Sequence, residues 1–249
     1  MQKWLEVTAL VQSDLAPVET PDIVDECHTH LAAVPWKGDI TGFGKGVQFT
    51  ARHLALFLSN EWLDDEMINT GSDWILHQVG ASRQTEIVNC LHIQQLQHAH
   101  AAGFPYIPQT RLDHLISTCD IDILFLPLYV FRNHWMLLQV NLSNAAYSYA
   151  DCLHHEVSPL TLTLNLVQWW IASLSPHISH LKLVPFNFDL PWQHDGFSYG
   201  IIVLDLVATI LLQHSIWNPK SAAVQCMEWF LHLSADLCAL SEVHLYFSK

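Results

Sequence analysis

The sequence predicts an α+β domain in which helices flank a central sheet of mixed or antiparallel strands. Three apolar runs joined by short polar turns lie in the middle of the chain, and longer segments with helical spacing precede and follow them. This order of elements is typical of α+β proteins. The 249 residues are 51% hydrophobic and 14% charged, so the chain can bury a large core.

Two parts of unequal size are expected along the chain. Residues 1–45 are predicted to be an N-terminal extension, and residues 46–249 the main domain. The first part holds a short apolar stretch, an acidic stretch with proline and a glycine-bearing loop over residues 38–46. Glycine and proline interrupt regular structure, so we read this part as a flexible lead-in and assign it no chemistry.

Helices are predicted at the start of the main domain. Residues 49–58 have a helical pattern, and a longer helix begins within the segment 60–69 and continues to Val79. Asp64 or Asp65 can cap this second helix, and acidic residues in a first turn suit the helix dipole. Residues 111–117 are expected to form a further short helix.

A β meander is predicted next. The apolar runs 121–131, 134–142 and 146–150 are separated by turns at 132–133 and 143–144. A strand over 181–186 is expected later in the chain. The remaining predicted elements are helices over 160–174, 200–213 and 222–240.

Charge and hydropathy exclude several functions. The net charge of −14 argues against nucleic-acid binding, which calls for a basic surface. The longest apolar candidate, residues 201–212, contains Asp205 and is shorter than the roughly 20 residues that a membrane span needs. No secretory signal is visible at the start, so we expect six reduced cysteines and a nuclear or cytoplasmic protein.

Two groups rich in histidine contain residue types that can bind a metal. His98 and His100 are two residues apart, a spacing that suits ligands on one helix less well than a spacing of four, so we expect no metal and no cofactor. The groups are Cys27 with His28 and His30, and His92 with His98 and His100.

Three short motifs carry residues that suit nucleophilic catalysis. A catalytic thiol needs a base, and an acid that orients the base. His134 and Asp151 lie on neighbouring strands of the predicted meander and can fill these two roles. The residue before Gly200 opens an apolar helix, where the dipole and free N–H groups stabilise an anion. The side-chain amide of Gln193 can stabilise an oxyanion.

Taken in order, the motifs resemble the catalytic domain of the ubiquitin-like-protein (SUMO/sentrin) cysteine proteases. That family carries a W-L-N/D-D-E-x-I-N helix start, an H-W pair, a Y-x-D element and Q-x-N-G-x-D-C-G before a long helix. This chain has WLDDEMIN over 62–69, NHW over 133–135, YAD over 149–151 and QHDGFSYG over 193–200. The resemblance covers residues 49–249 and implies a papain-like fold of the SUMO-protease type.

The resemblance also implies roles for individual residues. His134 matches the general base, Asp151 the residue that orients it, and Gln193 the oxyanion donor. Trp62 and Trp135 match the aromatic walls of a narrow tunnel for the Gly-Gly tail of the substrate. Asp65 matches the acidic residue of the helix start.

The last motif departs from the family pattern. The family's D-C-G is Ser198-Tyr199-Gly200 here, so tyrosine stands in the place of the nucleophilic cysteine, and Asp195 replaces the usual asparagine. A tyrosine phenol has an ordinary pKa of about 10 and is a poor nucleophile at neutral pH. Cys152 follows Asp151 rather than opening the helix, so we expect no rescue from that thiol.

Three functions stay open at this point. The first is an inactive protease that binds a ubiquitin-like protein or another ligand in the old cleft. The second is an enzyme in which Tyr199, His134 and Asp151 perform acid–base chemistry on a small apolar substrate. The third is an ordinary SUMO isopeptidase whose native residue at position 199 is cysteine.

Overall fold

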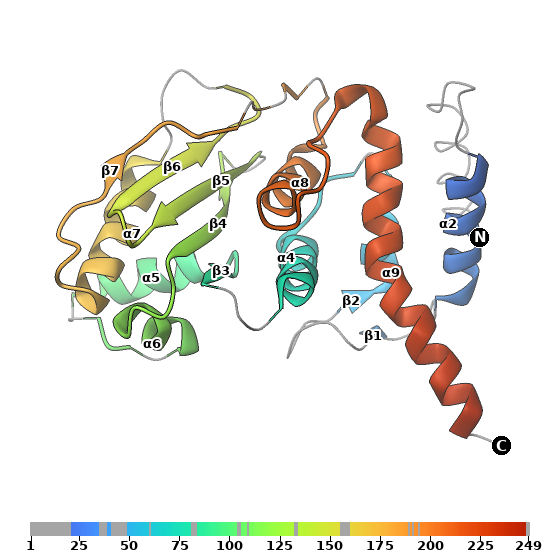
Figure 1. Cartoon of the computed structure of the whole chain (residues 1–249), viewed down its shortest axis with the longest axis horizontal. Coiled ribbons are helices and arrows are strands. Elements are labelled where there is room, and N and C mark those ends of the chain that lie inside the picture. Colours follow the sequence, from blue (N-terminus) through green and yellow to red (C-terminus); the bar gives the residue numbers. More distant parts are fainter. Residues whose placement is uncertain are drawn as a thin grey trace. The chain divides into compact units, whose positions relative to one another are not determined.

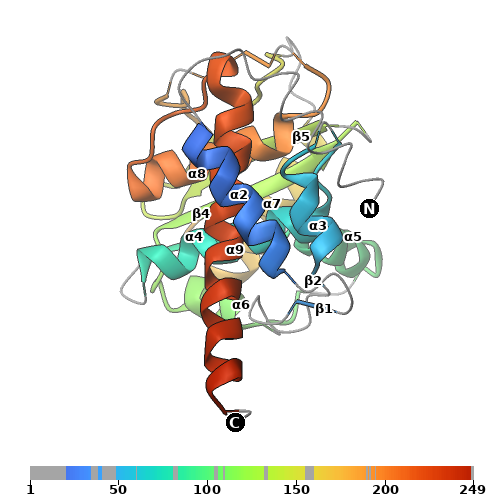
Figure 2. The same ribbon diagram turned by 90° about the vertical axis from the view of Figure 1, so that its right-hand side faces the viewer.

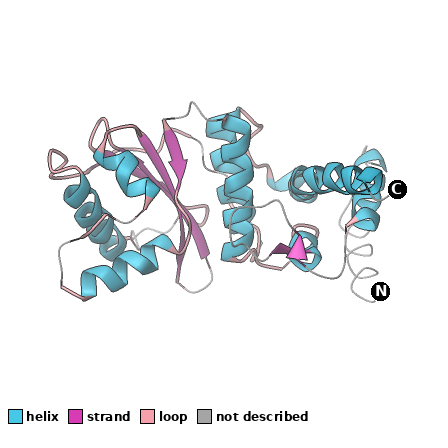
Figure 3. Cartoon of the chain, turned by 90° about the horizontal axis from the view of Figure 1, so that it is seen from below, coloured by secondary structure: helices cyan, strands magenta, loops and turns pink. Residues whose placement is uncertain are grey.

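The computed structural model divides into two compact units, which are described separately. The helical unit comprises Met1–Ile75 and Gln193–Lys249, and the sheet unit comprises Leu76–Trp192. Figures 1, 2 and 3 show the chain from three directions. The structure describes residues 21–34, 39–40, 49–59, 61–80, 84–103, 106–108, 110–131, 134–154, 160–188, 190, 192–193 and 195–247.

A five-stranded mixed sheet forms the centre of the sheet unit, with the order β3-β4-β5-β6-β7 (Figure 1). The three middle strands pair antiparallel, and both outer strands run parallel to their neighbours. The strands are β3 (Thr85–Ile87), β4 (Ile123–Val130), β5 (His134–Asn141), β6 (Ala146–Ala150) and β7 (Lys182–Leu183).

The helices α5 (His92–Ala101), α6 (Arg111–Ser117) and α7 (Thr161–Leu174) bury their apolar side chains with those of the sheet in one core. Leu96, Ile116 and Trp170 bring one residue from each helix into this cluster. The strands β4 and β5 supply residues such as Leu126 and Leu138 to the same core. The helices and the sheet are therefore held together mainly by the burial of apolar surface.

Asp113 ties two of these helices together by polar contacts. Its fully buried carboxylate accepts hydrogen bonds from the Trp170 indole, at 2.8 Å, and from the Tyr106 hydroxyl. It also accepts one from the backbone N–H of Thr110, which caps α6 in return. These hydrogen bonds replace most of those to water that the carboxylate loses when it is buried.

The helical unit contains the helices α8 (Tyr199–Leu212) and α9 (Ala222–Phe247) and several further elements. Helix α2 (Pro21–Ala33) runs alongside α9, as Figures 1 and 2 show. The ring Nδ1 of His30 lies 2.7 Å from the hydroxyl of Ser234 across this contact. The other elements are β1 (Asp39–Ile40), β2 (Phe49–Thr50), α3 (Ala51–Leu56), the 3-10 helix η1 (Pro219–Ser221) and α4 (Asp65–Val79), whose residues 76–79 belong to the sheet unit.

Most predicted elements are found, with small shifts of their ends. The meander of β4, β5 and β6 is present, as are the helices predicted at residues 111–117, 160–174 and 200–213. Strand β3 and helix α5 were not predicted, and α2 gives regular structure to part of the expected lead-in. The predicted turn at 132–133 lies outside the described residues, as does most of the loop at 38–46. Within the described part of the chain, no helix is long and apolar enough to cross a membrane.

Candidate functional site

His134 and Asp151 form a buried pair in the sheet unit. The ring Nε2 of His134 lies 2.8 Å from Oδ1 of Asp151, and the two residues are 1% and 5% exposed. His134 opens β5, and Asp151 directly follows β6, its antiparallel neighbour. The backbone N–H of Leu153 donates to the same carboxylate oxygen at 2.9 Å, which fixes its orientation. The sequence-based expectation that a meander brings these two side chains together therefore agrees with the structure.

Trp135 follows His134 in β5, and successive side chains of a strand point to opposite faces of its sheet. The Trp135 side chain is 2% exposed, and its ring centroid lies 5.1 Å from that of Tyr129. Tyr129 is its cross-strand partner on β4 and is itself half exposed. The predicted role of Trp135 as a wall for a substrate tail stays a prediction.

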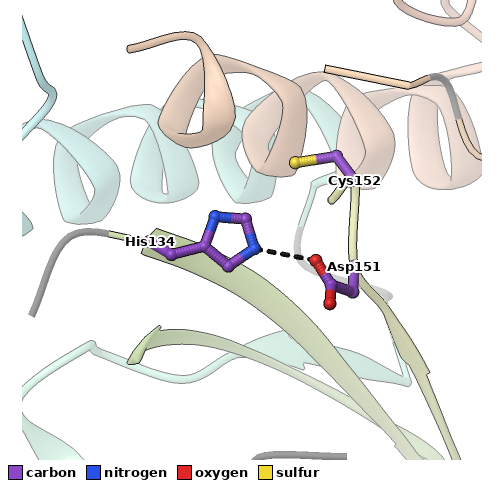
Figure 4. Close-up of side chains that lie close together, drawn as sticks. All are labelled: His134, Asp151 and Cys152. Atoms are coloured by element: carbon purple, nitrogen blue, oxygen red, sulfur yellow. Dashed lines mark hydrogen bonds and ion pairs between the residues drawn. The ribbon is translucent and has the colours of Figure 1, made fainter. Parts of the chain in front are cut away.

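Cys152 also lies beside His134 and Asp151, a placement that the sequence did not predict. Its Sγ, a ring nitrogen of His134 and a carboxylate oxygen of Asp151 all lie within 4.8 Å of one another (Figure 4). The turn after β6 produces this arrangement, because the N–H of His154 donates to the carbonyl of Asp151 at 3.0 Å. Periodicity along a sequence carries no signal for such a turn.

The other predicted residues lie in the helical unit, where Tyr199 is the first residue of α8. Tyr199 is 4% exposed, and its ring centroid lies 6.0 Å from that of Trp62 in a tilted arrangement. The indole N–H of Trp62 donates to the carbonyl of Gly196 at 2.8 Å, although half of this side chain is exposed. Trp62 is thus held by two contacts beside the N-terminus of α8 while it keeps an accessible face.

Asp195 organises the turn that leads into α8. Its carboxylate accepts hydrogen bonds from the N–H groups of Phe197 and Ser198 and from the Ser198 hydroxyl. Partial burial alone raises the pKa of this carboxyl, but the hydrogen bonds from Ser198, Phe197 and Gln193 outweigh it and hold the pKa below its ordinary value. The two departures from the family pattern at positions 195 and 198 are therefore direct partners.

Gln193 and Asp65 occupy defined places in the same unit. The side-chain amide of Gln193 donates to the carbonyl of Asp195 at 2.8 Å and to its carboxylate at 3.2 Å. Asp65 is the first residue of α4, and Asp64 caps this helix by accepting from the N–H of Met67 at 3.0 Å. The roles that the family pattern gives to Gln193 and Asp65 stay predictions.

Gly200 allows α8 to approach the start of α4 closely. A Cβ at this position would lie 2.9 Å from Cβ of Leu63 and 3.3 Å from Cδ1 of Ile68. Real Cβ atoms are not found so close to neighbours that cannot move. The glycine after Tyr199 is therefore required by packing, independent of any chemistry.

In the part of the chain that the structure describes, the histidine-rich groups named from the sequence do not bring three metal-ligating atoms together. His92 and His100 instead contact the rings of Trp170 and Trp169. Burial lowers the pKa of His92, although Asp113 acts in the opposite direction. Among the residues that the structure describes, one group of three metal-ligating side chains is found, namely His134, Asp151 and Cys152.

Comparisons with known proteins identify the fold. The chain is similar to the SUMO protease Ulp1 with its catalytic cysteine oxidised to a sulfenic acid, with a TM-score of 0.67 and 20% identity over 90% of this chain and 99% of the other. For the C-terminal Ulp1 protease domain in complex with Smt3, the yeast ortholog of SUMO, the TM-score is 0.61 at 18% identity, over 88% and 96% of the two chains.

A third similar structure is the catalytic domain of an Ulp1-like SUMO protease from Chaetomium thermophilum. Its TM-score is 0.55 at 15% identity, over 90% of each chain. No protein-family model matches the sequence. No curated protein sequence matches it either. The chain thus has the α+β cysteine-protease fold of Ulp1, and the predicted fold class is confirmed.

Proposed function

We propose that this protein binds a ubiquitin-like protein and does not cleave it. The observation that carries the proposal is the identity of the residue that opens α8, which is Tyr199 in a chain that has the Ulp1 fold over nine tenths of its length. One of the similar structures is a complex with Smt3, so this fold can present a surface to such a modifier. A phenol cannot supply the thiolate on which cysteine proteolysis depends.

The binding half of the proposal draws support from Trp62. The family resemblance assigns this residue to the recognition of the modifier's tail, and here its indole is anchored while half of the side chain is exposed. Tryptophan is enriched among the residues that dominate binding energy at protein interfaces. A half-exposed tryptophan held by Gly196 and Tyr199 has little conformational freedom to lose on binding.

The absence of cleavage is tested with a covalent probe. The full chain is incubated with SUMO and ubiquitin vinyl sulfones, and adducts are detected by intact-protein mass spectrometry. We expect no adduct, because a vinyl sulfone captures a reactive thiolate. An adduct that forms on the wild-type chain and is lost in a Cys152→Ala variant would contradict the proposal, since it would identify an active thiol.

The His134–Asp151 pair favours a second candidate, an acid–base enzyme with a small apolar substrate. A module that only binds a partner does not need a buried histidine oriented by a carboxylate at 2.8 Å. In this candidate His134 is the base that Asp151 orients, and Tyr199 is the predicted acid. Turnover of p-nitrophenyl esters measures it, and Tyr199→Phe is expected to abolish any activity found. Full activity in that variant would exclude Tyr199 from the chemistry.

A further inference from the structure

The cluster of Cys152, His134 and Asp151 combines three different metal-ligating groups in one buried place. Their Sγ, ring nitrogen and carboxylate oxygen lie within 4.8 Å of one another, and the three residues are 4%, 1% and 5% exposed (Figure 4). Ligands around a zinc ion lie about 2.0–2.3 Å from it, so donor atoms at this spacing need only small side-chain movements to share one ion.

Strand pairing and a hydrogen-bonded turn hold the backbone that carries these donors. His134 is fixed in β5 by its strand partners, and the turn that holds Asp151 and Cys152 follows β6 in the same sheet. Two hydrogen bonds close this turn, from the N–H of His154 to the Asp151 carbonyl and from the N–H of Leu153 to the Asp151 carboxylate. A donor set on a rigid scaffold loses little entropy when an ion binds.

The chemistry of the donors selects the kind of ion. A thiolate, an imidazole and a carboxylate are the three side-chain ligands that Zn²⁺ uses, whereas Mg²⁺ and Ca²⁺ prefer oxygen alone. The thiolate and the carboxylate together carry two negative charges, which balance a divalent cation in a buried place. Three protein ligands leave the fourth tetrahedral position for water or another donor.

We propose that His134, Asp151 and Cys152 form a binding site for one Zn²⁺ ion. The sequence alone predicts no metal, and the position of Cys152 beside His134 changes that expectation. Direct coordination by all three side chains exchanges the hydrogen bond between His134 and Asp151 for bonds to the ion. An occupied site therefore withdraws His134 from any role as a base, so that zinc acts as an inhibitor of acid–base chemistry at this residue.

Metal titration of the full chain tests this site without reference to any modifier. The protein is purified with a chelator and a non-thiol reductant, and ZnCl₂ is then titrated against a chromophoric competitor. We expect one ion per chain with submicromolar affinity. Removal of a second-shell partner typically lowers metal affinity about 10–100-fold, so Cys152→Ala and His134→Ala, which remove direct ligands, are expected to lower it at least about 100-fold.

Cys119→Ala is the matched control, because Cys119 is an exposed thiol of the same unit at the end of α6. This variant should bind zinc as the wild type does. Cobalt in place of zinc gives a second readout, since a thiolate ligand produces a charge-transfer band that is present in Cys119→Ala and absent in Cys152→Ala. Circular dichroism establishes that each variant is folded.

Two results would contradict the proposed zinc site. One is the absence of stoichiometric submicromolar zinc binding by the folded wild type. The other is unchanged affinity and an unchanged cobalt spectrum in folded Cys152→Ala. If Cys152→Ala does not fold, Asp151→Asn takes its place and must also weaken zinc binding. Failure of this inference leaves the proposed binding of a ubiquitin-like protein untouched, because neither measurement involves a modifier.

Discussion

The carboxylate of Asp195 accepts two hydrogen bonds from Ser198, from the backbone N–H at 2.8 Å and from the hydroxyl at 2.6 Å. The family pattern has asparagine at the first of these positions and an acid at the second. In this chain the acidic residue is Asp195, three residues before the family's position. Ser198, which occupies the family's acidic position, donates hydrogen bonds to it. The turn before α8 is thus held by an interaction that depends on both departures.

Replacement of Asp195 by alanine should therefore destabilise the protein. The variant leaves the N–H groups of Phe197 and Ser198 without their acceptor, which costs about 1–2 kcal/mol for a partly buried carboxylate. Asp195→Asn should lose less stability, because its amide oxygen can still accept the hydrogen bonds from the backbone N–H groups. Urea unfolding of the three proteins at pH 7 measures both differences, and an alanine variant as stable as the wild type would contradict this account.

The stabilisation of the folded state by Asp195 should depend on pH. The folded-state pKa of Asp195 is lowered, so its stabilisation is complete above the unfolded pKa of about 3.9 and is lost as pH falls through the lower folded pKa. The gap in unfolding free energy between the wild type and Asp195→Ala should narrow below about pH 4. A constant gap down to pH 2 would show that the charge of Asp195 is not involved.

The raised pKa of Asp205 should give the free energy of unfolding a pH dependence of the opposite sign. It is buried in α8, and burial raises its pKa to about 7, although hydrogen bonds from Trp229 and Trp217 act against this and the charge of Glu228 acts with it. The folded chain favours the protonated carboxyl, so the wild type loses stability as pH rises from about 4 to 7. Relative to the wild type, Asp205→Asn should gain about 2–4 kcal/mol over this range.

Comparing the wild type with Asp205→Asn separates the titration of Asp205 from the titration of neighbouring groups. Burial raises the pKa of Glu228 and lowers that of His232, where His214 adds to the effect, and both proteins share these groups. Chemical denaturation at pH 4, 5, 6, 7 and 8 gives the difference directly. Parallel stability curves for the two proteins would show that Asp205 does not titrate in this range.

Gly200 provides a test of packing at the start of α8. An alanine Cβ there would meet Leu63 at 2.9 Å, and overpacking of this kind costs about 1–3 kcal/mol despite the better helix propensity of alanine. Gly196→Ala is the matched control, because a Cβ at that position meets nothing within 4 Å. Thermal and urea unfolding should separate the two variants, and equal stabilities would contradict the close approach of α8 to Leu63.

Much of the fold could be predicted because its strands are strongly apolar. The predicted range of β6 agrees with the structure, since its apolar residues are bounded by turn-forming ones. Helix α5 was missed because its buried positions include His92, which packs on Trp170 and looks polar in the sequence. Helix α2 was missed because an acidic, proline-bearing start hides the residues that face α9, such as Cys27.

The candidate site could be predicted only in part, for a related reason. The pairing of His134 with Asp151 follows from strand order, which sequence patterns reveal. The placement of Cys152 and the bonding of Asp195 to Ser198 depend on turns, whose backbone angles are set by local hydrogen bonds. Motif comparison marked position 195 as a departure but gave no sign of its partner.

Trp62 should dominate the recognition of a ubiquitin-like protein. Trp62→Ala removes a half-exposed anchor, and we expect at least a roughly 30-fold loss of affinity, as for interface residues worth about 2 kcal/mol. Leu162→Ala is the control, because Leu162 is also apolar and is 79% exposed on α7. Equal affinities of the two variants for the same modifier would remove Trp62 from the proposed interface.

Binding of the wild-type chain to a panel of ubiquitin-like proteins tests the central claim most directly. Isotope-labelled SUMO, Smt3 and ubiquitin are each titrated with the full chain, and their amide resonances are followed by NMR. The account predicts saturable shifts in at least one modifier, with its C-terminal tail intact at the end of the titration. Spectra of every modifier that remain unchanged at saturating concentrations, or the appearance of a cleaved tail, would contradict it.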